Sequence, residues 1–78
     1  MADESPVQRM NGTVLTNGKQ IAVDGLPLSV EAFLMARDLL PRSVVVEHNG
    51  EAVAPSDFAE RMVESGDRLE IVRIVAGG

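Results

Sequence analysis

The sequence closes with Arg68-Leu69-Glu70-Ile71-Val72-Arg73-Ile74-Val75-Ala76-Gly77-Gly78, an apolar and β-branched run that ends in two glycines. Successive side chains of a strand point to opposite faces, so Leu69 and Ile71 share one face. If that face meets the core, Val72 and Ile74 remain exposed on the other. Because glycine lacks a Cβ, the last two residues can enter a narrow cleft of another protein and present the terminal carboxylate there. A frayed end without function is the alternative.

Two Asn-Gly dipeptides, Asn17-Gly18 and Asn49-Gly50, lie between runs of β-branched residues. Both residues of such a pair tolerate positive φ, which the tight turn of a β-hairpin requires. The sequence therefore predicts two hairpins. Their strands are expected at 12–16 and 19–24 for the first hairpin, and at 43–48 and 52–53 for the second.

A helix is predicted between the two hairpins. Ser29 can accept a hydrogen bond from a free N–H of the first turn, and Glu31 places negative charge near the positive end of the helix. Pro41 disfavours the helical conformation of the residue before it, so we expect it to end the helix. The apolar residues at helical spacing are Val30, Phe33, Leu34 and Leu40, with Phe33 as the central residue.

A second, shorter helical segment is predicted after Ser56, where Phe58 and Met62 would lie four residues apart on one face. We expect Met62, like Met35, to fill a gap in the core. The last strand, which follows a turn at 65–67, is expected to be the longest. The resulting order is strand, strand, helix, strand, strand, short helix, strand. This order favours an α+β fold with a mixed sheet that is covered on one face.

Composition narrows the possible functions. The 78 residues allow one domain, and a net charge of −5 argues against binding to nucleic acid or to an anionic membrane. No apolar run approaches the roughly 20 residues of a membrane span, and the acidic N-terminus is unlike a signal peptide. We therefore expect a cytoplasmic protein. Without cysteine, and with His48 as the single histidine, the sequence predicts no metal site and places His48 at the surface beside its turn.

Five stretches, spread over roughly residues 12–78, carry a resemblance to a known family. They are Ser29-Val30-Glu31-Ala32-Phe33-Leu34, Val46-Glu47-His48-Asn49-Gly50-Glu51, Val53-Ala54-Pro55-Ser56-Asp57-Phe58-Ala59-Glu60, Ser65-Gly66-Asp67-Arg68-Leu69-Glu70-Ile71-Val72 and Val75-Ala76-Gly77-Gly78. Together they resemble the ThiS-type sulfur carriers, which have the ubiquitin-like β-grasp fold. The molybdopterin synthase small subunit is related in fold and tail. The second and third stretches favour ThiS, although Ala54 before Pro55 departs from the family pattern.

Residues 1–11 carry no sustained period and are expected to form a flexible leader. For the rest of the chain the resemblance implies a β-grasp domain of about five strands and one main helix at 12–74, and a flexible reactive tail at 75–78. It implies that a ThiF-like adenylyltransferase, using ATP and Mg²⁺, adenylates the Gly78 carboxylate, which then becomes a thiocarboxylate. The sulfur would come from a donor such as a cysteine desulfurase. It would pass to a ThiG-like thiazole synthase in thiamine biosynthesis. On this view the chain is a carrier and not an enzyme, with no catalytic residue and no cofactor of its own.

Two further sets of residues are expected to meet these partners. Val75, Ala76 and Gly77 would continue the tail into a partner cleft, and Val72 and Ile74 form a candidate docking patch. Three alternatives remain open at this point. The chain could carry sulfur for molybdopterin or cysteine synthesis, modify other proteins through its C-terminus, or act as a non-covalent ubiquitin-like binding module.

Overall fold

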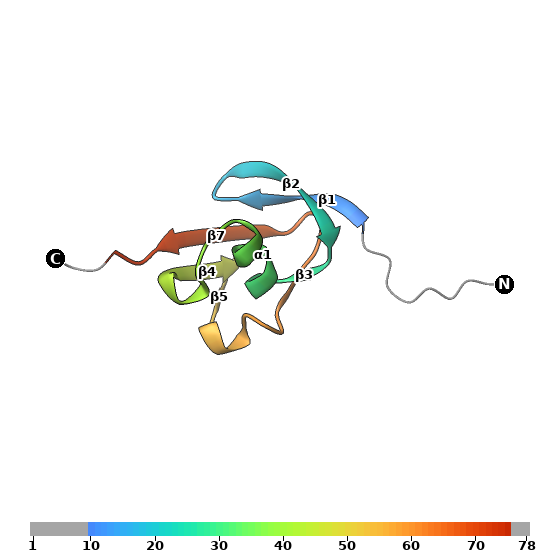
Figure 1. Ribbon diagram of the computed structural model, residues 1–78. Helices are drawn as coiled ribbons and strands as arrows, with labels where there is room; N and C mark the ends of the chain where they lie inside the picture. Colours follow the sequence, from blue (N-terminus) through green and yellow to red (C-terminus); the bar gives the residue numbers. More distant parts are fainter. Residues whose placement is uncertain (1–9, 76–78) are drawn as a thin grey trace.

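The computed structural model describes residues 10–75 (Figure 1). The strands are β1 (Met10–Thr16), β2 (Lys19–Leu26), β3 (Leu28–Ser29), β4 (Val44–His48), β5 (Glu51–Val53), β6 (Met62–Val63) and β7 (Arg68–Arg73). The helix α1 spans Val30–Ala36, and two 3-10 turns lie in the connections, η1 (Pro41–Ser43) and η2 (Pro55–Asp57). Met10 and Asn11, which were predicted to belong to the leader, lie in β1. The rest of the predicted leader and the tail residues after 75 lie outside the described part of the chain.

Five of the strands form one mixed sheet in the order β2-β1-β7-β4-β5. β1 and β7 run parallel, and every other neighbouring pair in this sheet is antiparallel. α1 packs against one face of the sheet, as Figure 1 shows, and β3 pairs with β6 in a small separate ladder. The α+β β-grasp architecture predicted from the sequence is confirmed. It places the last strand in the centre of the sheet, between β1 and β4.

The hydrophobic core fills the space between α1 and the covered face of the sheet. Leu69 and Ile71 of β7 are buried there, while Glu70 and Val72 between and beyond them are exposed. Phe33, with 1 % of its surface exposed, lies in this core as predicted. The other buried apolar residues are Val14, Leu26, Val30, Leu34, Val44, Val46, Val53, Phe58 and Val63. Burial of each large apolar side chain contributes roughly 1.5–3 kcal/mol to the free energy of folding.

The helix begins as predicted but ends earlier. The Ser29 hydroxyl accepts a hydrogen bond from the Ala32 N–H at 3.0 Å, so Ser29 is the N-cap. The last helical residue is Ala36, and Asp38 then adopts a left-handed φ of 61°. The backbone therefore leaves the helix before Pro41 can act. As a result Leu40, predicted to face the core, is 63 % exposed.

Three other expectations from the sequence are wrong. The segment after Ser56 is a single 3-10 turn that begins at Pro55, and no side chain caps it. Met62 lies in β6 opposite Ser29 and is exposed, as is Met35 on the solvent side of α1, so neither fills the core. The longest strand is β2, with eight residues, because the first hairpin extends beyond its predicted limits on both sides.

Among residues 10–75, no helix has the length and apolar character that a membrane span needs.

Candidate partner-binding end of strand β7

On the β1 side, the first half of β7 is hydrogen-bonded by the Asn17 side chain, in the position where a strand backbone would otherwise pair with it. β1 ends at Thr16, and its parallel pairing with β7 stops at Leu69. The Asn17 amide then continues the ladder, because its Oδ1 accepts from the Ile71 N–H at 2.7 Å and its Nδ2 donates to the Ile71 carbonyl at 3.0 Å. The Asn17 backbone N–H also donates to the Leu69 carbonyl at 2.9 Å. Asn17 therefore provides hydrogen-bond partners for the backbone groups of Leu69 and Ile71 beyond the end of β1.

The second Asn-Gly turn holds β7 from its other side. The Asn49 N–H donates to the Arg68 carbonyl at 2.8 Å, and the Asn49 Oδ1 accepts from the Arg68 N–H at 2.8 Å. Asn17 and Asn49 both have φ near +50°, a conformation that asparagine adopts more readily than most residues. The sequence identified both dipeptides as turns. It did not reveal that each asparagine also binds the last strand, because that contact joins residues far apart in the chain.

His48 lies in a buried hydrogen-bond network at the start of β7, and the prediction of a surface histidine is wrong. Its exposed fraction is 6 %, and its Nε2 lies 2.7 Å from Asp67 Oδ2. The Arg61 Nε–H donates to His48 Nδ1 at 2.9 Å, so Nδ1 carries no proton and Nε2–H donates to the carboxylate. This contact is thus a hydrogen bond of a neutral imidazole. With both nitrogens engaged inside the fold, His48 is not available as a general base.

The same network lowers the pKa of two carboxyl groups, those of Asp67 and Glu51. Burial by itself would raise the pKa of Asp67, but hydrogen bonds from the Glu64 N–H, His48 and Asn49 outweigh it and lower that pKa below its ordinary value. Arg61 also hydrogen-bonds Glu51, and this contact lowers the pKa of the Glu51 carboxyl. The network joins the second hairpin, the segment before β6 and the turn before β7.

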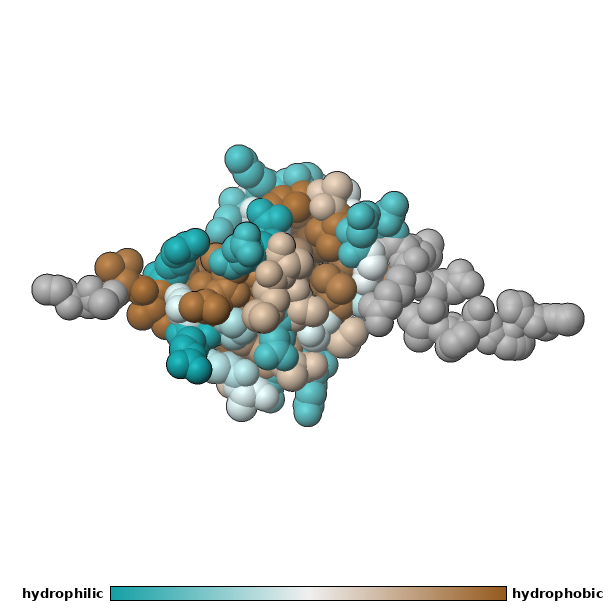
Figure 2. All heavy atoms as spheres, in the orientation of Figure 1, coloured by the Kyte–Doolittle hydropathy of each residue, from teal (hydrophilic) through white to brown (hydrophobic). Residues whose placement is uncertain are grey.

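The second half of β7 is supported on one side only. On the β4 side the ladder continues, and the Ile74 N–H donates to the Ser43 carbonyl at 2.8 Å. On the β1 side no residue of the first hairpin pairs with β7 beyond Ile71. Three large apolar side chains are exposed along this segment, Val72 at 63 %, Ile74 at 57 % and Val75 at 83 %. Figure 2 shows hydrophobic residues leading up to the C-terminal end of the described chain.

The predicted patch of Val72 and Ile74 is therefore exposed, and its docking role stays a prediction. An exposed apolar residue that the sequence did not single out lies beside it. Val45 is the direct cross-strand neighbour of Val72, and its exposure follows from the alternation of β4, in which Val44 and Val46 are buried. Leu40 lies with Arg73 at a small depression beside the end of α1. The tail residues Ala76, Gly77 and Gly78 lie outside the described part of the chain.

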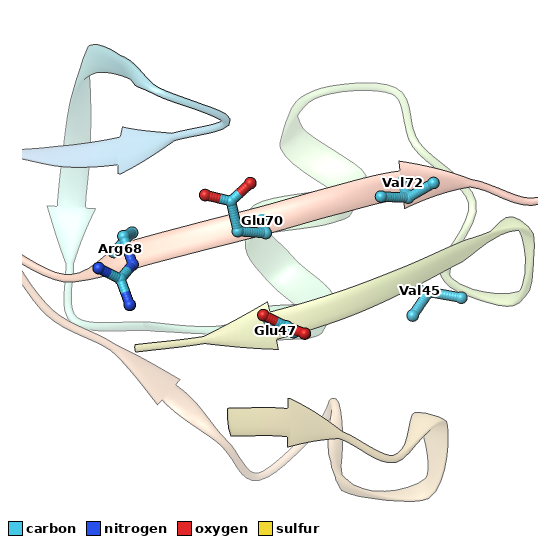
Figure 3. Close-up of a pocket in the computed structure, with 5 residues that line it drawn as sticks. All are labelled: Val45, Glu47, Arg68, Glu70 and Val72. Atoms are coloured by element: carbon cyan, nitrogen blue, oxygen red, sulfur yellow. The ribbon is translucent and has the colours of Figure 1, made fainter. Parts of the chain in front are cut away.

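A shallow depression crosses the open face of the sheet between β4 and β7. Figure 3 shows the five side chains that line it, which are Val45, Glu47, Arg68, Glu70 and Val72. The apolar pair lies toward the end of β7 and the charged residues lie toward its start. Within residues 10–75, no three His, Asp or Glu side chains gather closely enough to hold a metal ion. This face therefore combines an apolar pair with three charged side chains along neighbouring strands.

Comparison with known proteins gives a consistent result. The model of the ThiS family matches residues 8–78. A solved structure of the thiamine biosynthesis protein ThiS from Geobacter metallireducens is 34 % identical, has a TM-score of 0.73, and covers 85 % of this chain and 99 % of that one. A protein named thiazole synthase from Paramagnetospirillum magneticum is 43 % identical over 51 residues, which are 65 % of this chain and only 16 % of the relative. The chain belongs to the ThiS family.

Proposed function

We propose that this chain is a sulfur carrier of thiamine biosynthesis whose cargo is held on the Gly78 carboxyl group. The observation that carries the proposal is the build of β7. Its first half is fixed in the sheet by Asn17 and Asn49, and its second half leads through exposed apolar residues toward the terminal Gly77-Gly78. Membership of the ThiS family and the 34 % identical ThiS structure support the same function.

The proposed chemistry takes place on the C-terminal carboxylate and in partner enzymes. A carboxylate resists nucleophilic attack because its negative charge repels the nucleophile and oxide is a poor leaving group. In the first step a Gly78 oxygen attacks the α-phosphorus of ATP, and pyrophosphate leaves as the acyl-adenylate forms. In the second step a sulfide attacks the acyl carbon, the acyl–oxygen bond breaks, and AMP leaves. The product is a thiocarboxylate that can hand its sulfur to an acceptor.

This chain is then a substrate of other enzymes rather than a catalyst. Val75, Ala76 and Gly77 would lie extended in the partner's cleft, where their small size leaves room for the approach of ATP. Val72 and Ile74 would rest on the surface around that cleft. Strand geometry limits the depth of insertion, since the six steps from Val72 to Gly78 span roughly 20 Å when the chain is extended.

The proposed partners are an adenylyltransferase of the ThiF type, a sulfur donor such as a cysteine desulfurase, and a thiazole synthase of the ThiG type. The relative from Paramagnetospirillum supports the last of these, because its ThiS-like stretch belongs to a longer chain named thiazole synthase. ATP and Mg²⁺ would be bound by the adenylyltransferase. We expect the reactions to take place in the cytoplasm, where ATP is supplied.

Intact-mass measurement tests the proposal. The chain is incubated with ATP, Mg²⁺, sulfide and the ThiF-type enzyme of the same organism, and a variant lacking Gly78 is the control. We expect a mass gain equal to the exchange of one oxygen for sulfur in the full chain and none in the control. No gain, with an enzyme shown to be active on another carrier, would contradict the proposal. Isopeptide conjugates to lysine would point instead to a protein modifier.

A second measurement separates thiamine synthesis from the related pathways. The thiocarboxylate form is mixed with thiazole synthase, with molybdopterin synthase or with a cysteine-forming synthase, and the return of the chain to its carboxylate mass is followed. We expect the sulfur to be lost fastest to thiazole synthase. Faster loss to either of the other two enzymes would assign the carrier to that pathway.

A further inference from the structure

The open face of the sheet carries two side-chain pairs directly opposite each other on β4 and β7. Val45 lies across from Val72, and Glu47 lies across from Glu70. All four side chains are exposed, and Figure 3 shows them along one depression with Arg68 at its far end. The face is thus divided into an apolar pair near the tail and an acidic pair one step further from it.

The acidic pair is unfavourable for the isolated fold. Like charges directly opposite on neighbouring strands destabilise a sheet. Within residues 10–75, neither Glu47 nor Glu70 lies at ion-pair distance from a basic side chain, whereas Glu51 pairs with Arg61. Arg68 lies toward the second hairpin turn, with its Nη2 3.4 Å from the position that a Cβ on Gly50 would take. Arg68 thus lines the same depression, but in the described part of the chain it does not form an ion pair with either carboxylate.

We propose that this pair is a recognition element for the adenylyltransferase, which would place a cationic side chain between Glu47 and Glu70 and an apolar side chain on Val45 and Val72. This inference rests on the proposed function. The position of the pair is suitable, because Val72 leads directly into the segment that carries Gly78 toward the enzyme. The net charge of −5 likewise favours a basic partner surface.

Arginine fits the two carboxylates better than lysine. Its planar guanidinium presents five N–H donors and can bind two carboxylates at once, one on each edge. The depression lies on the solvent side of the sheet, so the cation would remain partly hydrated and its effect would depend on salt. The apolar pair supplies contact area and the acidic pair supplies orientation. Together they would set the direction in which the tail enters the cleft.

The test measures adenylation kinetics of the double variant Glu47→Gln/Glu70→Gln in the full chain. The matched control is Glu60→Gln/Glu64→Gln, which changes the net charge equally at two exposed glutamates outside this face. ATP–pyrophosphate exchange gives KM and kcat for each chain at low and at physiological salt. We expect KM to rise roughly tenfold for the first variant, equivalent to about 1.4 kcal/mol, with kcat unchanged. The control should stay within twofold of the natural chain.

Two further readouts separate recognition from folding. Thermal unfolding should show the Glu47→Gln/Glu70→Gln variant to be at least as stable as the natural chain, because a repulsion is removed. Its KM should also lose most of the salt dependence that the natural chain shows. An unchanged KM, or an equal rise in the control, would overturn the recognition role while leaving the proposed function intact. Absence of exchange with the natural chain would overturn the proposed function and this inference together.

Discussion

The two halves of β7 are built for opposite purposes. From Asp67 to Ile71 the strand has partners on both sides, two of them asparagine side chains from hairpin turns, and its Leu69 is fully buried. From Val72 to Val75 it has a partner on one side only, and its large apolar side chains face solvent. The comparison shows how a small domain can hold a strand firmly and still offer its end. Buried contacts are concentrated in the first half, and exposed apolar surface is concentrated in the second.

Removing a large side chain from each half should separate these purposes most clearly. Leu69→Ala leaves a cavity at a fully buried site, and we expect it to lower the free energy of unfolding by about 2–5 kcal/mol. Ile74→Ala changes an exposed site, and we expect a change within about 0.5 kcal/mol. Urea denaturation gives both values. For Ile74→Ala we also expect a several-fold rise in KM for adenylation. Equal losses of unfolding free energy in the two variants would contradict the proposed difference between the two halves of β7.

Asn17→Ala tests whether a side chain holds the first half of β7 in place. The change leaves the Ile71 N–H and carbonyl without their partners, and we expect a loss of roughly 1–3 kcal/mol in unfolding free energy. Hydrogen exchange should show faster exchange at the Ile71 amide, with the Ile74 amide unchanged. Asn11→Ala, at an exposed asparagine of the same strand, is the control. If both variants lose the same stability, the bonds to Ile71 do not contribute.

Asp67 makes the stability of the fold depend on pH, and this should be the smallest of the three effects. Its pKa is lowered in the folded chain, so its contribution to stability is complete above the unfolded pKa of about 3.9. That contribution is lost as the pH falls through the lower folded value. Asp67→Asn should therefore flatten the decline of stability below about pH 5. Identical acid unfolding curves for the variant and the natural chain would exclude a role for this carboxylate.

Local patterns in the sequence predicted much of this fold. Ser29 caps the helix, both Asn-Gly pairs form hairpin turns, and the alternation in the last strand places Leu69 and Ile71 in the core. Each of these features depends on residues only a few positions apart. The exposed positions of Val72 and Ile74 follow from the same alternation.

Most of the errors come from contacts between distant parts of the chain, and one comes from a local turn. His48 was expected at the surface because its neighbours suggest a turn, yet Asp67 and Arg61 enclose it. Leu40 was assigned to the core because its spacing continues that of the helix, but the left-handed turn at Asp38 ends the helix first. The bonds from Asn17 to Ile71 span 54 positions and have no local signature. The exposure of Val45, by contrast, follows from the alternation along β4.

The central position of β7 also has a consequence for how the chain reaches its folded form. β1 and β4 flank β7 and do not pair with each other. The five-stranded sheet therefore cannot form until β7 lies between them. Pairing of strands so distant in sequence is slow to nucleate, and unpaired strand edges invite aggregation in the meantime. A molecule cleaved before Arg68 would expose both edges permanently. The same strand that leads toward the C-terminus therefore also holds the two parts of the sheet together.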